Sequence, residues 1–171
     1  HKMVEILETY KKNADGGLVK IFSGESHWNF YDWSEFSEGR CGKAEEPIAD
    51  CYINTLFVIA LDSFEYICEK ASLPFPYVSM ADKMRDLINK HFYVGNGRYT
   101  VVEGKAQYTN LVNALAILSG AAKGDAARQT AERIIEGNLS DCSLSMKVLE
   151  YDALLSVNTE KYSPVILDEI R

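Results

Sequence analysis

Apolar residues repeat with helical spacing along most of the chain beyond residue 50, in segments of two alternating kinds. From Ile48 to Ala71 apolar side chains occupy nearly every angular position of a helix, and the same holds from Ala106 to Ala121. From Tyr77 to Phe92 and from Asp125 to Glu136, apolar residues form one stripe and charged residues lie mostly on the other side. A helix that is apolar all round must be covered on all sides, whereas a helix with one apolar stripe keeps a face in water. The pattern predicts buried helices alternating with half-exposed ones.

The C-terminal third of the chain continues this alternation. A third pair of helices is expected over residues 144–157 and 160–170, and a further helix precedes all of them over Met3–Lys12. Glycines and prolines fall between the segments, which is typical of connecting turns. Ser140 or Asp141 is expected to cap the helix that follows.

Repeated pairs of a buried and a half-exposed helix indicate helical hairpins stacked around a common axis. The expected fold class is all-α, a partial α/α toroid of helical hairpins with alternating inner and outer helices. Residues 96–105 are expected to form a short β-hairpin or an extended loop. An open superhelix of the tetratricopeptide kind is the alternative, but the repeats of such solenoids have a fixed length. The buried segments begin near residues 48, 106 and 141, so their spacing is unequal, which favours the toroid. Residues 1–171 are expected to form a single domain.

Composition narrows the classes of partner. The 171 residues carry 18 Lys+Arg and 25 Asp+Glu, a formal net charge of −7, which opposes sequence-independent binding to nucleic acid. The longest apolar run, Leu56–Leu61, is far shorter than the roughly 18–20 residues that span a bilayer, so no membrane segment is expected. Four cysteines are present, namely Cys41, Cys51, Cys68 and Cys142. They show no metal-ligand spacing, so no metal or other cofactor is expected, and the last three are interpreted as small buried residues.

Candidate chemistry is concentrated in residues 23–39, ahead of the first buried helix. If the buried helices point their N-termini to one end of the fold, residues 23–47 gather there with residues 94–106 and 137–142. Aromatic rings stack on the apolar face of a sugar, and carboxylates accept hydrogen bonds from its hydroxyl groups. The segment offers such side chains at Trp28, Tyr31, Asp32, Trp33 and Glu35.

We therefore expect these residues to bind carbohydrate. Asp32 is predicted to accept hydrogen bonds from sugar hydroxyls, Trp33 to stack on the ring, and Glu35 to assist, with Trp28 and Tyr31 as further substrate-binding residues. The residues that would carry out catalysis are not identified by this pattern.

The same residues also allow structural interpretations. Trp28 and Trp33 could simply close the end of the toroid, and Asp32 and Glu35 could cap a helix beginning near Ser34. A helical interaction scaffold without an active site, in which the aromatic segment contacts a partner, is thus the alternative function. Residues 94–106 and the two positions that follow hold four polar or aromatic residues that are expected to be structural or solvated, namely Tyr99, Glu103, Gln107 and Tyr108.

The runs WNFYDWSEF, YINTLFVIALDSFEYI and AQYTNLVNALAILSG, with GRYT before the third, resemble the catalytic region of bacterial α-L-rhamnosidases. In that family an aromatic-Asp-Trp loop precedes an inner helix of a six-hairpin toroid, and a Gln-rich start with an Asn-Ala-Leu-Ala-like run opens the next one. The matching residues are Asp32-Trp33, Gln107 and Asn113-Ala114-Leu115-Ala116. The resemblance covers nearly the whole chain, although other six-hairpin sugar hydrolases or lyases share the helical pattern.

The resemblance implies inverting hydrolysis of a terminal α-L-rhamnosyl or related sugar, in which one acid protonates the leaving oxygen and one carboxylate activates water. In the family the acid lies in a tryptophan-bearing loop that contains Asp-Glu-Arg, and the base lies in a Thr-x-Trp-Glu-like segment. Neither motif occurs in this chain. The chain is therefore expected to be an internal part of a larger six-hairpin catalytic domain and to hydrolyse nothing by itself. It is also expected to self-associate through apolar faces at the open ends of its arc.

Overall fold

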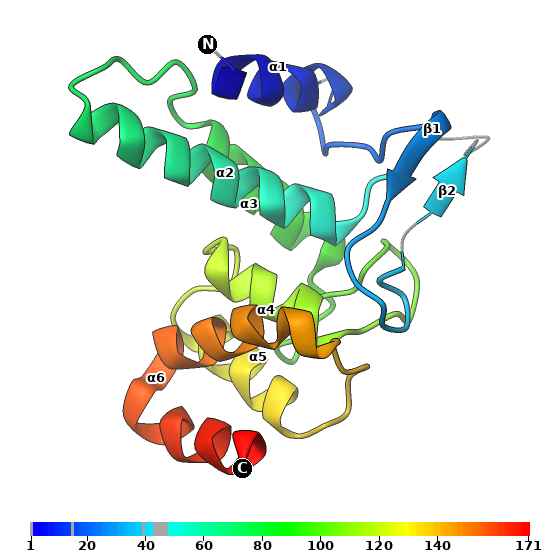
Figure 1. Ribbon diagram of the computed structural model, residues 1–171, viewed down its shortest axis with the longest axis vertical. Coiled ribbons are helices and arrows are strands. Elements are labelled where there is room, and N and C mark those ends of the chain that lie inside the picture. The colour runs from blue at the N-terminus through cyan, green and yellow to red at the C-terminus, as the bar shows by residue number, and fades with distance from the viewer. Residues whose placement is uncertain (1, 15, 39, 43–47) are drawn as a thin grey trace.

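The fold is built of α-helices, with one short pair of strands among the described residues (Figure 1). The computed structural model describes residues 2–14, 16–38, 40–42 and 48–171. The all-α class predicted from the periodicity is confirmed. In chain order the elements are α1 (Lys2–Ala14), β1 (Gly24–Asn29), β2 (Arg40–Gly42), α2 (Cys51–Lys70), α3 (Met80–Phe92), α4 (Asn110–Leu118), α5 (Asp125–Ile135), the 3₁₀ turn η1 (Leu144–Met146) and α6 (Lys147–Ile170).

Buried and half-exposed helices alternate along the chain, as the pattern predicts. Every residue of α4 from Asn110 to Ile117 is buried, and so is most of the N-terminal half of α2. α3 and α5 each bury one stripe and keep the opposite face in solvent. α4 packs against α2, α5 and α6, while α2 also packs against α1 and α3. The helical hairpins therefore lie side by side, with α4 in the middle (Figure 1).

The third predicted pair of helices lies within α6, which is itself a hairpin. Asn158 has non-helical backbone angles (φ −161°, ψ 98°), and it divides α6 into a first arm, residues 147–157, and a second arm, residues 159–170. Its side chain accepts a hydrogen bond of 2.9 Å from the backbone N–H of Lys161, so it caps the second arm. The arms fold back on each other, because Lys147 Nζ lies 2.8 Å from Glu169 Oε1. Figure 1 shows the first arm beside α4.

Side-chain caps determine where α2 and α4 begin. Asp50 accepts a hydrogen bond of 2.8 Å from the backbone N–H of Ile53, and Thr109 accepts one of 3.0 Å from Val112. Such caps satisfy backbone donors that a helix leaves unpaired in its first turn. Both helices consequently start a few residues later than their apolar periodicity suggests.

A buried asparagine follows each of these caps by four residues. The side-chain amide of Asn54 accepts a hydrogen bond from the backbone N–H of Val19 (2.8 Å) and donates one to its carbonyl (2.9 Å). Asn113 makes the same pair of contacts with the backbone of Tyr99, at 2.9 and 3.3 Å. Each asparagine thus fixes an extended segment that precedes its helix.

Ser140 and Asp141 do not cap α6, contrary to the prediction. The helix begins only at Lys147, after η1, and its N-cap position is Met146, which makes no side-chain cap. Ser140 Oγ instead donates to Glu35 (2.9 Å), and Asp141 pairs with Lys147 (2.8 Å). Both polar side chains are engaged in tertiary contacts, so they are not available to the helix end.

The strand pair is also placed differently from the expectation. β1 and β2 are antiparallel, with an irregularity between Gly24 and Trp28, in a region where no strand was predicted. Residues 96–105 form the extended loop that was one of the two expected outcomes, with an isolated bridge between Tyr93 and Tyr99 at its start. No helix begins near Ser34, because residues 33–38 form turns.

Two further expectations concern the cysteines and a possible membrane segment. Cys51, Cys68 and Cys142 are free and buried, which confirms their interpretation as small core residues. α2, by length and composition alone, is apolar enough to cross a membrane, although the sequence was not expected to contain such a segment. Half of its most apolar window is buried inside the molecule.

Candidate functional site

The N-terminal ends of α2, α4 and α6 lie at one end of the molecule, on the side of β1 and β2 (Figure 1). The backbone N–H of Cys51, the first residue of α2, donates a hydrogen bond of 2.8 Å to the carbonyl of Val101. Ser140, which precedes α6, donates to the carboxylate of Glu35. The described parts of the three segments singled out in the sequence therefore meet at this end, as expected.

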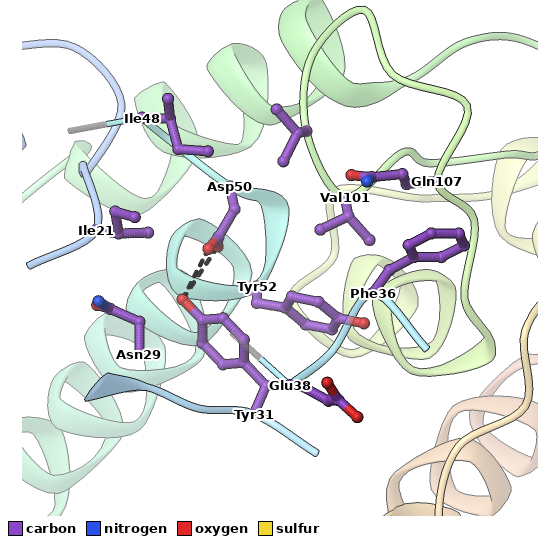
Figure 2. Close-up of a pocket in the computed structure, with 11 residues that line it drawn as sticks. Ile21, Asn29, Tyr31, Phe36, Glu38, Ile48, Asp50, Tyr52, Val101 and Gln107 are labelled. Carbon is purple, nitrogen blue, oxygen red and sulfur yellow. Dashed lines mark hydrogen bonds between the residues drawn. The ribbon is translucent and has the colours of Figure 1, made fainter. Parts of the chain in front are cut away.

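A pocket of about 190 Å³ lies in front of the first turn of α2 (Figure 2). Its polar lining comes from Asn29, Glu38, Asp50 and Gln107. Its aromatic lining comes from Tyr31, Phe36 and Tyr52, and its aliphatic lining from Ile21, Ile48, Val101 and Val102. The pocket thus combines carboxylate and amide oxygens with aromatic rings.

Tyr31 and Asp50 form the polar centre of this pocket. The hydroxyl of Tyr31 donates to the carboxylate of Asp50, at 2.9 Å from Oδ2 and 3.2 Å from Oδ1 (Figure 2). The ring of Tyr31 stacks on that of Tyr52, with centroids 4.5 Å apart. Burial, and then the negative charge of Asp50, raise the pKa of Tyr31 far above its usual value. The phenol is therefore a permanent hydrogen-bond donor that holds the Asp50 carboxylate in place.

Tyr52 closes the inner wall of the pocket. Its hydroxyl exchanges hydrogen bonds with Ser37 and, at 2.7 Å, with Thr109 Oγ1. Burial raises the pKa of Tyr52, so this group too stays protonated at neutral pH. The wall connects the start of α2, the start of α4 and the loop of residues 30–38, and it gives the pocket a fixed frame.

An exposed aromatic cluster, formed by Trp28, Phe30 and Trp33, lies beside the pocket. Ring centroids are 5.0 Å apart for Trp28 and Phe30, 4.6 Å for Phe30 and Trp33, and 5.9 Å for the two tryptophans. Trp28 Nε1 donates to the backbone carbonyl of Glu38, a residue of the pocket lining. Trp28 is 53% exposed and Trp33 is 69% exposed. Large rings this open are available to stack on a ligand.

Asp32 is placed differently from the prediction that it accepts hydrogen bonds from a sugar. It is only 1% exposed. Its carboxylate accepts hydrogen bonds from the backbone N–H and hydroxyl of Ser143 and from the hydroxyl of Ser34. Burial alone would raise its pKa, but these hydrogen bonds outweigh it and lower the pKa of Asp32 below its usual value. The buried carboxylate serves the protein's own structure, and no part of it is left open to a substrate.

The remaining predicted residues divide between the pocket and its rim. Glu35 is exposed and accepts a hydrogen bond of 2.9 Å from Ser140 Oγ. Tyr31 lines the pocket, whereas Trp28 and Trp33 belong to the aromatic cluster outside it. The predicted residues therefore lie near one another, but only Tyr31 lines the pocket.

None of the four polar residues of the pocket lining was predicted from the sequence to bind substrate, and Asp50 and Gln107 show why. Asp50 directly precedes α2, and an aspartate in that place is a helix-cap signal that could have been found. Gln107 was considered structural or solvated, yet it lines the pocket from the loop before α4. Its contribution depends on the folding of residues 100–107 over the start of α2, which no local pattern reveals.

One group among the described residues could offer metal ligands, namely Asp141, Cys142 and Glu150, whose ligand atoms lie within 4.8 Å of one another. Lys147 Nζ lies 2.8 Å from Asp141 Oδ1 and 3.1 Å from Glu150 Oε1. The positive charge that these carboxylates need is thus supplied by the protein. The arrangement is that of a partly buried ion-pair cluster, in which Lys147 and Glu150 are enclosed and Asp141 is exposed.

Comparison with known proteins gives one informative likeness. No protein-family model matches the chain, and no curated protein matches it. Among solved structures, the chain is similar to the crystal structure of a GH78 family rhamnosidase of Bacillus sp. GL1, with a TM-score of 0.75 and 21% sequence identity over 99% of this chain. The match covers 18% of that rhamnosidase chain, so the present chain spans less than a fifth of its length. At this identity the likeness shows a shared fold, and the chain has a rhamnosidase-like fold.

Proposed function

We propose that this chain is part of a glycoside hydrolase of the α-L-rhamnosidase type, and that the end carrying the aromatic cluster binds a terminal α-L-rhamnosyl or related sugar. The observation that carries the proposal is the likeness to the GH78 rhamnosidase over 99% of the chain. In this proposal, α2, α4 and the first arm of α6 are inner helices of an α/α toroid, and their N-terminal ends bear the sugar-binding surface.

The aromatic cluster and the pocket have different tasks in this proposal. Trp33, the most exposed ring of the cluster, stacks on the apolar face of the sugar, and Trp28 extends that surface. Gln107 in the pocket accepts hydrogen bonds from sugar hydroxyls, whereas Asp50, which is 6% exposed and accepts from Tyr31 and the N–H of Ile53, shapes the pocket. Tyr31 orients Asp50, because its hydroxyl donates to that carboxylate.

Hydrolysis requires groups beyond those of this chain. Inverting glycosidases use two carboxyl groups about 6.5–9.5 Å apart, one as acid and one as base, on opposite faces of the sugar. The motifs that carry these groups in rhamnosidases do not occur in residues 1–171. The residues of this chain accordingly bind and orient the sugar, and the acid and base come from other parts of a longer protein.

Titration with L-rhamnose, followed by tryptophan fluorescence, tests the binding. We expect a saturable change for the wild type and about two- to tenfold weaker binding for Trp33→Ala, because stacking on one aromatic ring contributes about 0.5–1.5 kcal/mol. Tyr66→Ala is the matched control, because Tyr66 is an exposed ring on α2 outside the site, and its affinity should equal that of the wild type.

Two results would contradict the proposal. One is the absence of any saturable response to L-rhamnose, which would favour a helical interaction scaffold. The other is an affinity that Trp33→Ala leaves unchanged. Incubation with an aryl α-L-rhamnoside should release no phenol, and measurable release would show that the chain contains its own acid and base.

A further inference from the structure

Asp32 connects the aromatic cluster to a segment 111 residues further along the chain. Its Oδ2 accepts a hydrogen bond of 2.7 Å from the backbone N–H of Ser143 and one of 2.8 Å from Ser34 Oγ, while its Oδ1 accepts one from Ser143 Oγ. Hydrogen bonds to an ionised carboxylate are stronger than those between neutral groups. Since this carboxylate is also buried, the contact is a firm tie between two distant loops.

The backbone on either side of Asp32 forms a closed turn. The N–H groups of Tyr31 and Asp32 both donate to the carbonyl of Ser37, at 3.2 and 3.1 Å, and Ser37 N–H donates to Ser34 at 2.9 Å. Trp33 belongs to this turn, and its ring is 69% exposed and pairs with the rings of Trp28 and Phe30. The direction of that ring is therefore determined by the turn and by what holds the turn in place.

The far end of the tie is itself well anchored. Cys142, next to Ser143, donates its S–H to Glu150 Oε2 at 3.3 Å, and Asp141 pairs with Lys147. Both partners lie in the first arm of α6. Asp32 thus fastens the turn that carries Trp33 to the third helical hairpin.

We propose that Asp32 is a positioning residue of the sugar-binding end. It does not touch the sugar but holds Trp33 in the orientation in which the indole ring stacks on it. The inference rests on the proposed function, since it assumes that Trp33 contacts a sugar. Glu35 makes a similar tie to Ser140, but that contact is exposed and correspondingly weak.

The experiment uses the full chain labelled with 5-fluorotryptophan. Because the sequence contains two tryptophans, the ¹⁹F spectrum has two signals, which Trp28→Phe and Trp33→Phe assign. Asp32→Asn keeps the size of the side chain but removes its charge and one acceptor oxygen. We expect it to shift and broaden the Trp33 signal and to weaken L-rhamnose binding by no more than Trp33→Ala does. The matched control is Asp152→Asn, an exposed aspartate on α6, which should change neither quantity.

The outcomes separate the inference from the proposed function. If Asp32→Asn leaves both the Trp33 signal and the affinity unchanged while Trp33→Ala weakens binding as expected, the positioning role is overturned and the sugar site stands. If the wild type binds no L-rhamnose, the proposed function fails, and the inference fails with it. Should Asp32→Asn not fold, Ser143→Ala removes only one donor to Oδ1 and should produce a smaller shift of the Trp33 signal. An unchanged signal in that variant overturns the inference.

A pH titration gives a readout that a general loss of stability would not produce. The lowered pKa of Asp32 means that its carboxylate stays ionised to a lower pH than that of an ordinary aspartate. As the pH falls, the Trp33 signal should hold its position while exposed aspartates are protonated, and move only at lower pH, as the Asp32 carboxylate is protonated and the tie to Ser143 weakens. In Asp32→Asn this movement should be absent, and its persistence there would overturn the inference.

Discussion

α2 and α4 begin alike but are enclosed to different extents. Each is capped by a side chain and carries a buried asparagine four residues later. α4 lies between α2 and the first arm of α6, and its residues from Asn110 to Ile117 are all buried. α2 packs against α4, α3 and α1, yet Leu56 is 41% exposed, and Ala60 and Ile67 are exposed as well. The spacing of these three residues places them on one face of the helix.

The difference shows that a helix with apolar residues on all sides is fully buried only if neighbouring elements cover every side. α4 has helices on both sides and is fully enclosed. The exposed face of α2 borders an apolar pocket of about 350 Å³, whose lining includes Ile6 of α1, Trp28 of the aromatic cluster, and Leu56. No described part of the chain covers this face, although its residues are of the same kind as those buried in α4.

The largest expected effect compares one leucine in each helix. Leu115 in α4 is 2% exposed, so Leu115→Ala leaves a cavity and should lower the free energy of unfolding by about 4 kcal/mol. Leu56→Ala in α2 removes the same atoms from a half-open site and should lower it by less than about 1 kcal/mol. Urea unfolding followed by circular dichroism measures both, with equal slopes against urea as the check that the two variants unfold alike. Equal losses would mean that α2 is as enclosed as α4.

A second, somewhat smaller effect on the free energy of unfolding tests the buried asparagine that the two helices share. Asn54→Ala and Asn113→Ala each leave a buried backbone N–H and carbonyl without a partner, at Val19 and Tyr99 respectively. We expect both variants to lose about 3 kcal/mol in the free energy of unfolding, because unpaired buried polar groups are strongly destabilising. Asn138→Ala, at an exposed position, is the control and should lose less than about 0.5 kcal/mol.

The two asparagine losses should be equal if the start of each helix is the same structural unit. A much smaller loss at Asn54 would show that the openness of α2 extends to its first turns. Amide hydrogen exchange at Val19 and Tyr99 would locate the effect, since both N–H groups should lose protection in the corresponding variant.

The helices could be predicted from the sequence because their signal is local. Apolar spacing identified α2 to α5 and both arms of α6, and the burial of α4 followed from residues such as Leu111 and Leu115, which sit among other apolar residues. The same spacing missed the exposed face of α2. Leu56 and Leu115 look alike in sequence, and what distinguishes them is the presence of a neighbouring helix.

The candidate site was predicted less completely, because it depends on contacts between distant segments. The proximity of Trp28 and Trp33 to a pocket could be expected from their place before a buried helix. The burial of Asp32 could not, since it results from Ser143 in a loop more than a hundred residues away. Ser140 was likewise interpreted as a local cap, whereas its hydroxyl is bound to Glu35 across the fold.

The smallest expected effect concerns what covers the open face of α2. We expect a second copy of this chain to do so, because exposed apolar residues also occur at the other edge, at Leu144 of η1 and Val148 of the first arm of α6, and burying both edges is favourable. Leu56→Glu puts a charge into that contact and should raise the dissociation constant about tenfold in sedimentation equilibrium. Val78→Glu, at an exposed position outside the apolar pocket, should change it by less than about twofold. A wild-type chain that stays monomeric at millimolar concentration would show that this face remains open in solution, and the contrast between α2 and α4 would then stand without a partner.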